Sequence, residues 1–263
     1  IESRQMIYLK TEEEIELLRA ANQLVSATLA EIAKVVKPGV TTLELDALAE
    51  QFIRDHGAIP TFKGFPASFP DTDPFPASIC ASVNEVVVHG LPTAEPLKDG
   101  DIVSIDCGTF LNGFCGDSAY TFCVGEVSDE VKRLLRTTKE SLYKGIEAAL
   151  PNHRIGDIGA AVQSHCEAEG FGVVREFVGH GIGREMHEEP SIPNYGKRGT
   201  GKQLKNGLCI AIEPMITLGS PAIGMHPDKW SILTRDRSMA AHFEHTIAIH
   251  NGKADILSSF EEI

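Results

Sequence analysis

Two stretches of the chain follow one pattern: Leu97–Asp106 reads LKDGDIVSID, and Leu204–Glu213 reads LKNGLCIAIE. Each stretch begins with Leu-Lys, passes through a turn residue and a glycine into an apolar run typical of a β-strand, and ends on an acid. The sequence therefore predicts a duplicated unit in which two equivalent strands carry a carboxylate at the same place.

Two predicted helices precede each of these strands. The spacing of apolar residues and the positions of glycine and proline place them at Glu12–Lys34, Thr42–Asp55, Glu130–Ala149 and Ile155–Glu169. Thr42 is the expected N-cap of the second helix. Helices that precede runs of strands, rather than alternating with them, favour an α+β architecture.

The length of 263 residues suits a single catalytic domain over residues 1–263. The duplication predicts pseudo-symmetric halves over about 1–125 and 126–263. Residues 1–5 are expected to form a disordered or expression-derived tail. The two halves can then share one site.

Composition limits the function classes. A formal net charge of −13 and a pI of about 5.2 argue against a nucleic-acid-binding protein, which needs a basic surface. No apolar run approaches the roughly 20 residues that cross a bilayer, and no signal peptide is evident, so we expect a soluble, cytoplasmic protein. The six cysteines lack a Cys-x-x-Cys pair and are expected to be buried, reduced thiols.

A β-hairpin follows the first acid-tipped strand. Asn112-Gly113 is a strong turn signal, because both residues accept the positive φ angles of a type I′ turn. The register that this turn sets pairs Asp106 with Ala119 and makes Asp117 a diagonal neighbour of Asp106 on the same face. The two carboxylates are therefore expected to point at one spot.

Four strand acids with no adjacent basic residue, Asp106, Asp117, Glu213 and Glu244, would repel one another unless a cation lies between them. Ion pairs with distant lysines or arginines are one solution. Divalent metals are the other, and the imidazole of His180 in FVGHGIGREMHEEP is a candidate fifth ligand. Four carboxylates and one imidazole suit Mn, Fe, Co or Zn.

The segments that carry these residues, IDCG, GDSAYTF, GHGIG, IEPM and FEHT, resemble the ligand motifs of the dinuclear methionine aminopeptidases. The resemblance covers nearly the whole chain, and the short interval between His180 and Glu213 is similar to the type I class. It implies the pita-bread fold, a pseudo-twofold α+β domain with a central, mainly antiparallel, curved sheet.

The resemblance also implies an activity: a metallo-aminopeptidase that removes the initiator methionine from nascent proteins and peptides, using a hydroxide activated by two divalent metal ions (Co, Mn, Fe or Zn). Asp106 would bind one ion, and His180 and Glu213 mainly the other. Asp117 and Glu244 would bridge both. Glu213 would also act as the general base.

Further residues are implied by family position. His187 would hydrogen-bond the scissile carbonyl, and His89 would lie near the scissile nitrogen. The methionine pocket would be formed by four side chains, namely Phe75, Cys80, Met186 and Trp230. The motif FPAS occurs twice, at residues 65–68 and 75–78, which indicates an insertion of about ten residues in the entrance loop compared with the family.

The expected substrates are the N-termini of nascent polypeptides, either at the ribosome or away from it. The protein is expected to be a monomer that contacts neither DNA nor membranes. Two rival interpretations stay open. A prolidase or Xaa-Pro aminopeptidase has a similar ligand set, usually behind a large N-terminal domain. A non-enzymatic pita-bread protein would bind peptides without turning them over.

Overall fold

The computed structural model describes residues 6–263, and the expectation for residues 1–5 lies outside this range. Four α-helices begin and end within one residue of the predicted bounds. They are α1 (Glu12–Ala33), α2 (Thr42–Asp55), α3 (Asp129–Ala148) and α4 (Ile155–Ala168).

Capping side chains explain why the helices begin where they do. Thr11 accepts a hydrogen bond from the N–H of Glu14, whose side chain accepts one from the Thr11 N–H, and Thr41 and Glu44 repeat this capping box at α2. The prediction of Thr42 as N-cap was wrong by one residue, because only Thr41 has a glutamate three positions later. Thr42 instead accepts a hydrogen bond from the Thr93 N–H at 2.8 Å.

Four strands of the first half form one antiparallel sheet in the order β1-β4-β2, with β5 also paired to β4. Their bounds are β1 (Ile59–Pro60), β2 (Ile79–Val83), β4 (Ile102–Leu111) and β5 (Phe114–Cys123). The second half contributes a five-stranded antiparallel sheet in the order β15-β14-β9-β7-β8. Its members are β7 (Gly179–Gly181), β8 (Glu188–Ile192), β9 (Cys209–Ile212), β14 (His245–His250) and β15 (Lys253–Ile256).

Two smaller antiparallel sheets, ordered β13-β10-β6 and β11-β12-β3, complete the strands. They consist of β3 (Val86–Val88), β6 (Gly172–Val173), β10 (Met215–Thr217), β11 (Ile223–Met225), β12 (Ile232–Thr234) and β13 (Ala240–His242). The predicted α+β class with antiparallel strands is confirmed, but backbone pairing divides the expected central sheet into several parts. A bridge between Ala119 and Glu244 connects the two larger sheets.

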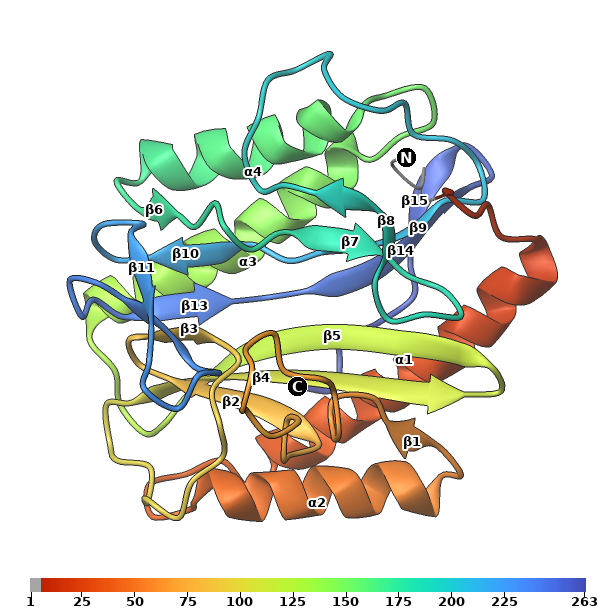
Figure 1. Ribbon diagram of the computed structural model, residues 1–263. Coiled ribbons are helices and arrows are strands. Elements are labelled where there is room, and N and C mark those ends of the chain that lie inside the picture. Colours follow the sequence, from red (N-terminus) through yellow and green to blue (C-terminus); the bar gives the residue numbers. More distant parts are fainter. Residues whose placement is uncertain (1–5) are drawn as a thin grey trace.

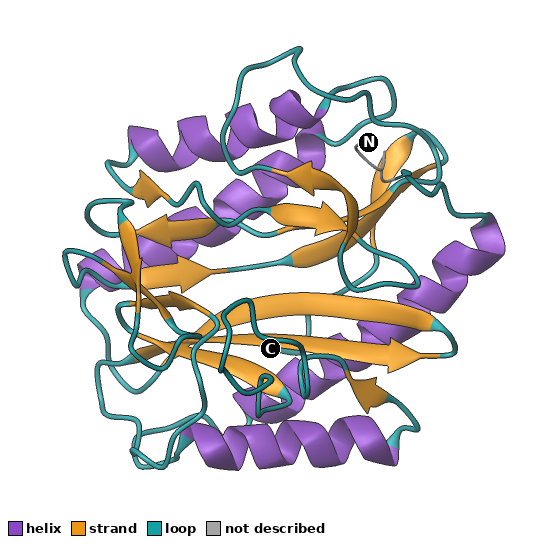
Figure 2. Cartoon of the chain, in the orientation of Figure 1, coloured by secondary structure: helices purple, strands orange, loops and turns teal. Residues whose placement is uncertain are grey.

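The two halves are arranged one above the other. α1 and α2 accompany β4 and β5, while α3 and α4 accompany β9 and β14 (Figure 1). The strands gather in the middle of the molecule and the helices lie outside and behind them (Figure 2). Each half has its own large apolar cluster, around Leu29 and Ile105 in the first and Leu142 and Ile212 in the second. Each such fully buried side chain stabilises the fold by roughly 1.5–3 kcal/mol.

The hairpin between β4 and β5 has the predicted register. Asn112 and Gly113 have φ angles of 51° and 85°, as a type I′ turn requires. Asp106 lies opposite Ala119, and Asp117 lies opposite Gly108, so both acids emerge on one face.

One expectation about the cysteines was wrong. All six are free thiols, and five of them are buried, but Cys123 is exposed. It is the last residue of β5, and its exposure comes from this place at the end of the strand, because Thr121, two residues earlier on the same face, is buried.

Candidate metal centre

Strands from both halves position the five predicted ligands. Asp106 and Asp117 lie on β4 and β5, and His180 lies on β7 opposite Ala211. Glu213 follows the last residue of β9. Glu244 lies between β13 and β14. The backbone bridge described above holds it against β5. The site therefore forms where the two larger sheets meet.

Hydroxyl side chains fasten this junction. Ser118 donates a hydrogen bond to the Glu244 carbonyl at 2.6 Å, and Thr246 donates one to the Asp117 carbonyl at 2.8 Å. The side-chain oxygen of Asn22, on α1, accepts from the Asp117 N–H at 3.0 Å. All three side chains are buried, so these bonds fix the backbone that carries the two acids without competition from water.

His180 is oriented toward the acids. Its Nδ1 lies 2.8 Å from the Gly181 carbonyl oxygen and donates to it, which directs Nε2 into the site. Nε2 lies 3.3 Å from Asp117 Oδ2 and 3.4 Å from Glu213 Oε1. Asp117, His180 and Glu244 each offer one ligand atom within 4.8 Å of the others, which is compact enough to surround a single ion.

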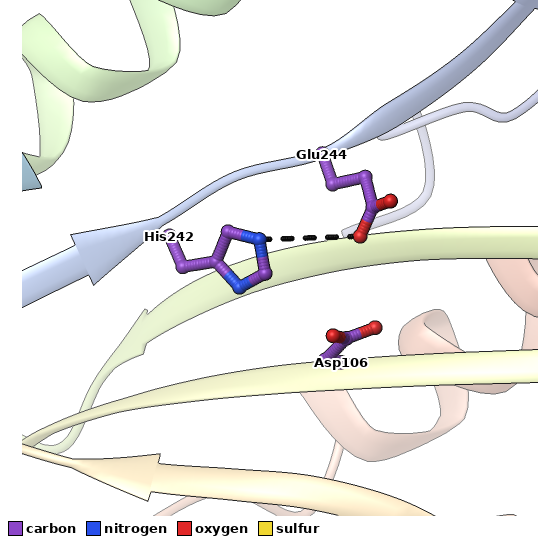
Figure 3. A group of neighbouring side chains, drawn as sticks. All are labelled: Asp106, His242 and Glu244. Carbon is purple, nitrogen blue, oxygen red and sulfur yellow. Dashed lines mark ion pairs between the residues drawn. The ribbon is translucent and has the colours of Figure 1, made fainter. Parts of the chain in front are cut away.

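A second such group contains Asp106, Glu244 and a residue that the sequence analysis missed, His242. Its imidazole is directed at the Glu244 carboxylate, and Asp106 lies on β4, beyond β5 from the segment that carries Glu244 (Figure 3). His242 Nε2 lies 3.2 Å from Glu213 Oε2 and 4.0 Å from Glu244 Oε2. Its position two residues before Glu244 in an extended run was the signal that could have revealed it, because such residues share a face.

Burial makes the charges of this cluster costly. Glu244 is 1% exposed and Asp117 3%. Burial, reinforced by the neighbouring Asp117, raises the pKa of both Asp106 and Glu244 well above the ordinary range. Burial alone would lower the pKa of His180, but its hydrogen bond to Asp117 and the charges of Glu213 and Asp117 outweigh this and raise the pKa to about 9.

Several carboxylate oxygens in the cluster have no hydrogen-bond partner within residues 6–263. They are Oδ1 of Asp106, Oδ1 of Asp117 and both side-chain oxygens of Glu244. Buried polar atoms are nearly always paired, and a buried charge left alone is especially unfavourable. In the described part of the chain no lysine or arginine forms an ion pair with any of the four acids. The donor set, oxygen-rich with imidazole, fits divalent transition metals.

A cavity of about 420 Å³ opens directly onto the cluster. Asp106, Asp117, His180 and Glu213 form part of its wall, together with His89 and His187. Burial, followed by the charge of a neighbouring histidine, lowers the pKa of both these imidazoles, and that of His89 reaches about 4. Both rings are therefore neutral at pH 7, and each can donate one N–H or accept one hydrogen bond.

The apolar wall of the cavity contains three of the four predicted pocket residues, Phe75, Cys80 and Trp230. The rings of Phe75 and Trp230 meet edge to face at 5.1 Å between centroids. Met186 differs: it does not line the cavity but packs in the apolar cluster around Phe114, against which Phe62 also packs. Phe62, Phe177 and Met215 line the cavity and were not predicted.

Comparison with known proteins matches residues 16–251 to the family described as "Metallopeptidase family M24". Among curated relatives, a methionine aminopeptidase of Clostridium acetobutylicum is 48% identical over 97% of this chain and 100% of its own length. Methionine aminopeptidase 1 of Bacillus subtilis is 49% identical over 96% of this chain and 99% of its own.

Solved structures give the same picture. The methionine aminopeptidase of Rickettsia prowazekii superposes with a TM-score of 0.93 at 43% identity, covering 97% of this chain and 100% of that one. A prolidase of Pyrococcus furiosus superposes with a TM-score of 0.73 at 22% identity, and 66% of its chain is covered. These likenesses confirm the expected pita-bread fold, and the full-length matches are to methionine aminopeptidases.

Proposed function

The chain belongs to metallopeptidase family M24 and is a methionine aminopeptidase, and from this premise we propose that it removes the initiator methionine of nascent proteins and peptides at the centre described above. One observation carries the proposal: buried acids and an imidazole with unpartnered ligand atoms converge beside an apolar cavity. The match over the full length of methionine aminopeptidases, against two thirds of a prolidase, supports this substrate over an Xaa-Pro peptide.

We infer that two divalent ions occupy the cluster. Asp106 would hold one, His180 and Glu213 mainly the other, and Asp117 and Glu244 would contact both. The two overlapping groups of ligand atoms, which share Glu244, support two positions. When bound, such ions supply Lewis acidity for the scissile carbonyl and lower the pKa of a coordinated water. Mn, Fe, Co and Zn all suit these ligands.

The protein's own groups would then manage protons and hydrogen bonds. Glu213 would accept the proton of the attacking water and pass it to the departing nitrogen. His242, 3.2 Å from Glu213 Oε2, would hold that carboxylate in place. His187, neutral at pH 7, would donate to the oxygen on which charge develops, a contact typically worth a few kcal/mol. His89 would lie beside the scissile nitrogen.

The substrate's first side chain would occupy the apolar end of the cavity. Phe75, Cys80 and Trp230 would surround a thioether, whose flexibility and polarizability suit an aromatic wall. Its α-amine would lie at the acid cluster, which favours a free amino terminus over an internal peptide bond.

Substrates for such a site are the N-termini of newly made chains, and we further infer a monomer that acts in the cytoplasm, at or near the ribosome. No helix among residues 6–263 is long and apolar enough to cross a membrane. The net charge of −13 gives no general attraction to ribosomal RNA, so any ribosome contact would be local.

The test compares hydrolysis of Met-Ala-Ser with that of Ala-Pro-Ser, using protein loaded with Mn or Co. We expect methionine release from the first peptide and no alanine release from the second. Glu213→Gln should lower kcat at least a hundredfold while the folded structure persists. Glu147→Gln, the same change on the exposed face of α3, should have no effect. Preferred cleavage of the Xaa-Pro peptide, or no turnover with any divalent metal, would contradict the proposal.

A further inference from the structure

The segment between β1 and β2 contains a loop of residues 66–74, here called the mouth loop. Two backbone hydrogen bonds close its base: the Phe75 N–H donates to the Phe65 carbonyl at 2.9 Å, and the Gly64 N–H donates to the Phe75 carbonyl at 2.8 Å. Figure 1 shows this segment in orange, in front of the first-half sheet. The mouth loop therefore projects from a base, here called the stem, that these bonds close between Gly64, Phe65 and Phe75.

The two FPAS copies that flank this loop have different environments. In the second copy Phe75 is 3% exposed and packs beside Trp230. In the first copy Phe65 is 40% exposed. The second copy therefore belongs to the core, whereas the first remains at the surface, although their sequences are identical.

The exposed apolar side chains of this region share one cavity. Phe65, Phe69 and Met225 all line the cavity that holds the acid cluster, and Phe69 and Met225 are 47% and 45% exposed. Large apolar side chains gathered around a cavity mouth are characteristic of a binding surface rather than of ordinary exposed residues. Part of their area remains available for burial by a ligand.

The direction of a bound peptide follows from the cavity having an inner end at the acid cluster and an open mouth. The first residue is fixed at the inner end, by the acids and by the wall around Phe75 and Trp230, so the rest of the peptide must leave through the mouth. The Phe65 ring meets the His187 ring edge to face at 5.7 Å. With His187 at the scissile carbonyl, Phe65 would lie beside the scissile bond, and Phe69 lies further along the chain, in the mouth loop.

In an extended peptide, side chains of residues 1 and 3 point to the same side. Phe75 and Phe69 line the same cavity, Phe75 from the stem and Phe69 from the mouth loop. A peptide whose methionine faces Phe75 would therefore bring its third side chain to the part of this wall nearer the mouth.

We propose that the mouth loop, through Phe69 and together with Met225 of the same cavity wall, forms a binding subsite for an apolar or aromatic side chain at the third residue of the substrate. This inference rests on the proposed function, because the methionine defines where residue 3 lies. The subsite would strengthen substrate binding without taking part in the chemistry, so it should change KM rather than kcat.

The test uses Met-Ala-Phe-Gly and Met-Ala-Gly-Gly with the metal-loaded enzyme. We expect kcat/KM to be about fivefold higher for the phenylalanine peptide, as expected if roughly half of that side chain is buried. Phe69→Ala should remove the preference, with kcat/KM for Met-Ala-Gly-Gly within about twofold of wild type. Replacing residues 66–74 by Gly-Gly should do the same. Phe110→Ala changes an equally apolar, exposed ring on β4 outside the cavity and serves as control.

Three results would overturn the inference. Equal kcat/KM for the two peptides in the wild-type enzyme would show that the third residue is not bound, while methionine release itself would uphold the proposed function. A preference that survives both Phe69→Ala and loop replacement would assign the subsite to another wall. No methionine release from either peptide would contradict the proposed function together with the subsite.

Discussion

Glu244→Gln is expected to make the metal-free protein more stable. Glu244 is 1% exposed, neither of its side-chain oxygens has a hydrogen-bond partner within residues 6–263, and burial beside Asp117 raises its pKa well above the ordinary range. The amide has the same shape but no charge. A buried charged group without partners costs about 1–3 kcal/mol or more, so removing this one should add about 2 kcal/mol to the free energy of unfolding.

The effect should depend on pH in a defined direction. A carboxyl group whose pKa is raised on folding binds its proton more tightly in the folded state, so wild-type stability is highest below the unfolded pKa of about 4.3 and falls as pH rises above it. The slope is at most about 1.4 kcal/mol per pH unit. The advantage of Glu244→Gln should therefore be small at pH 5 and larger at pH 8.

With metal bound, the wild-type protein should be more stable than Glu244→Gln. Binding to the native state alone adds RT ln(1 + [L]/Kd), about 2.7 kcal/mol at one hundred times Kd, and a variant that lacks a proposed bridging ligand should gain less. Urea unfolding at pH 5 and pH 8, with chelator and with Mn, measures all four conditions. Glu147→Gln on the exposed face of α3 is the matched control. A chelated Glu244→Gln variant less stable than wild type at pH 8, or equal stabilisation of both by Mn, would refute the reasoning.

Two other predictions concern groups around the cluster. Metal binding at pH 7.5 should release more than one proton, because His180, with a pKa of about 9, and Asp106 and Glu244, whose pKa burial raises well above the ordinary range, must all be deprotonated to bind metal. Calorimetry in buffers of different ionisation enthalpy would show this release, and a heat independent of buffer would contradict it. Asn22→Ala should lower the free energy of unfolding by about 2 kcal/mol, because the buried Asp117 N–H loses its acceptor; an unchanged urea midpoint would assign that N–H another partner.

The sequence was sufficient for elements set by local chemistry. Helix ends were predicted to within a residue because apolar spacing, glycine and proline mark them, and Asn112-Gly113 fixed the hairpin register through its positive φ angles. The error at α2 arose because two adjacent threonines can both cap, and the glutamate that decides between them lies three residues after Thr41.

Features that depend on contacts between the halves were harder to predict from the sequence. Glu244 was predicted from its extended run, but the backbone bridge that holds this run against β5, and so brings His242 to the cluster as well, is not indicated by any local pattern. Met186 resembles a pocket residue by position along the chain, yet its direction is set by close packing near Gly108. The mouth loop has no regular secondary structure, so its course depends on the stem at Phe65 and Phe75.

The hydrogen bonds of Ser118 and Thr246 across the junction have a consequence for cutting the protein in two. A fragment ending near Gly125 would carry Asp106 and Asp117, and the remainder would carry His180, Glu213 and Glu244. Neither piece alone holds a complete set of ligands. If the two fragments were produced separately, activity would return only when they reassociate. The recovered rate would then report how completely the junction between the two sheets forms again.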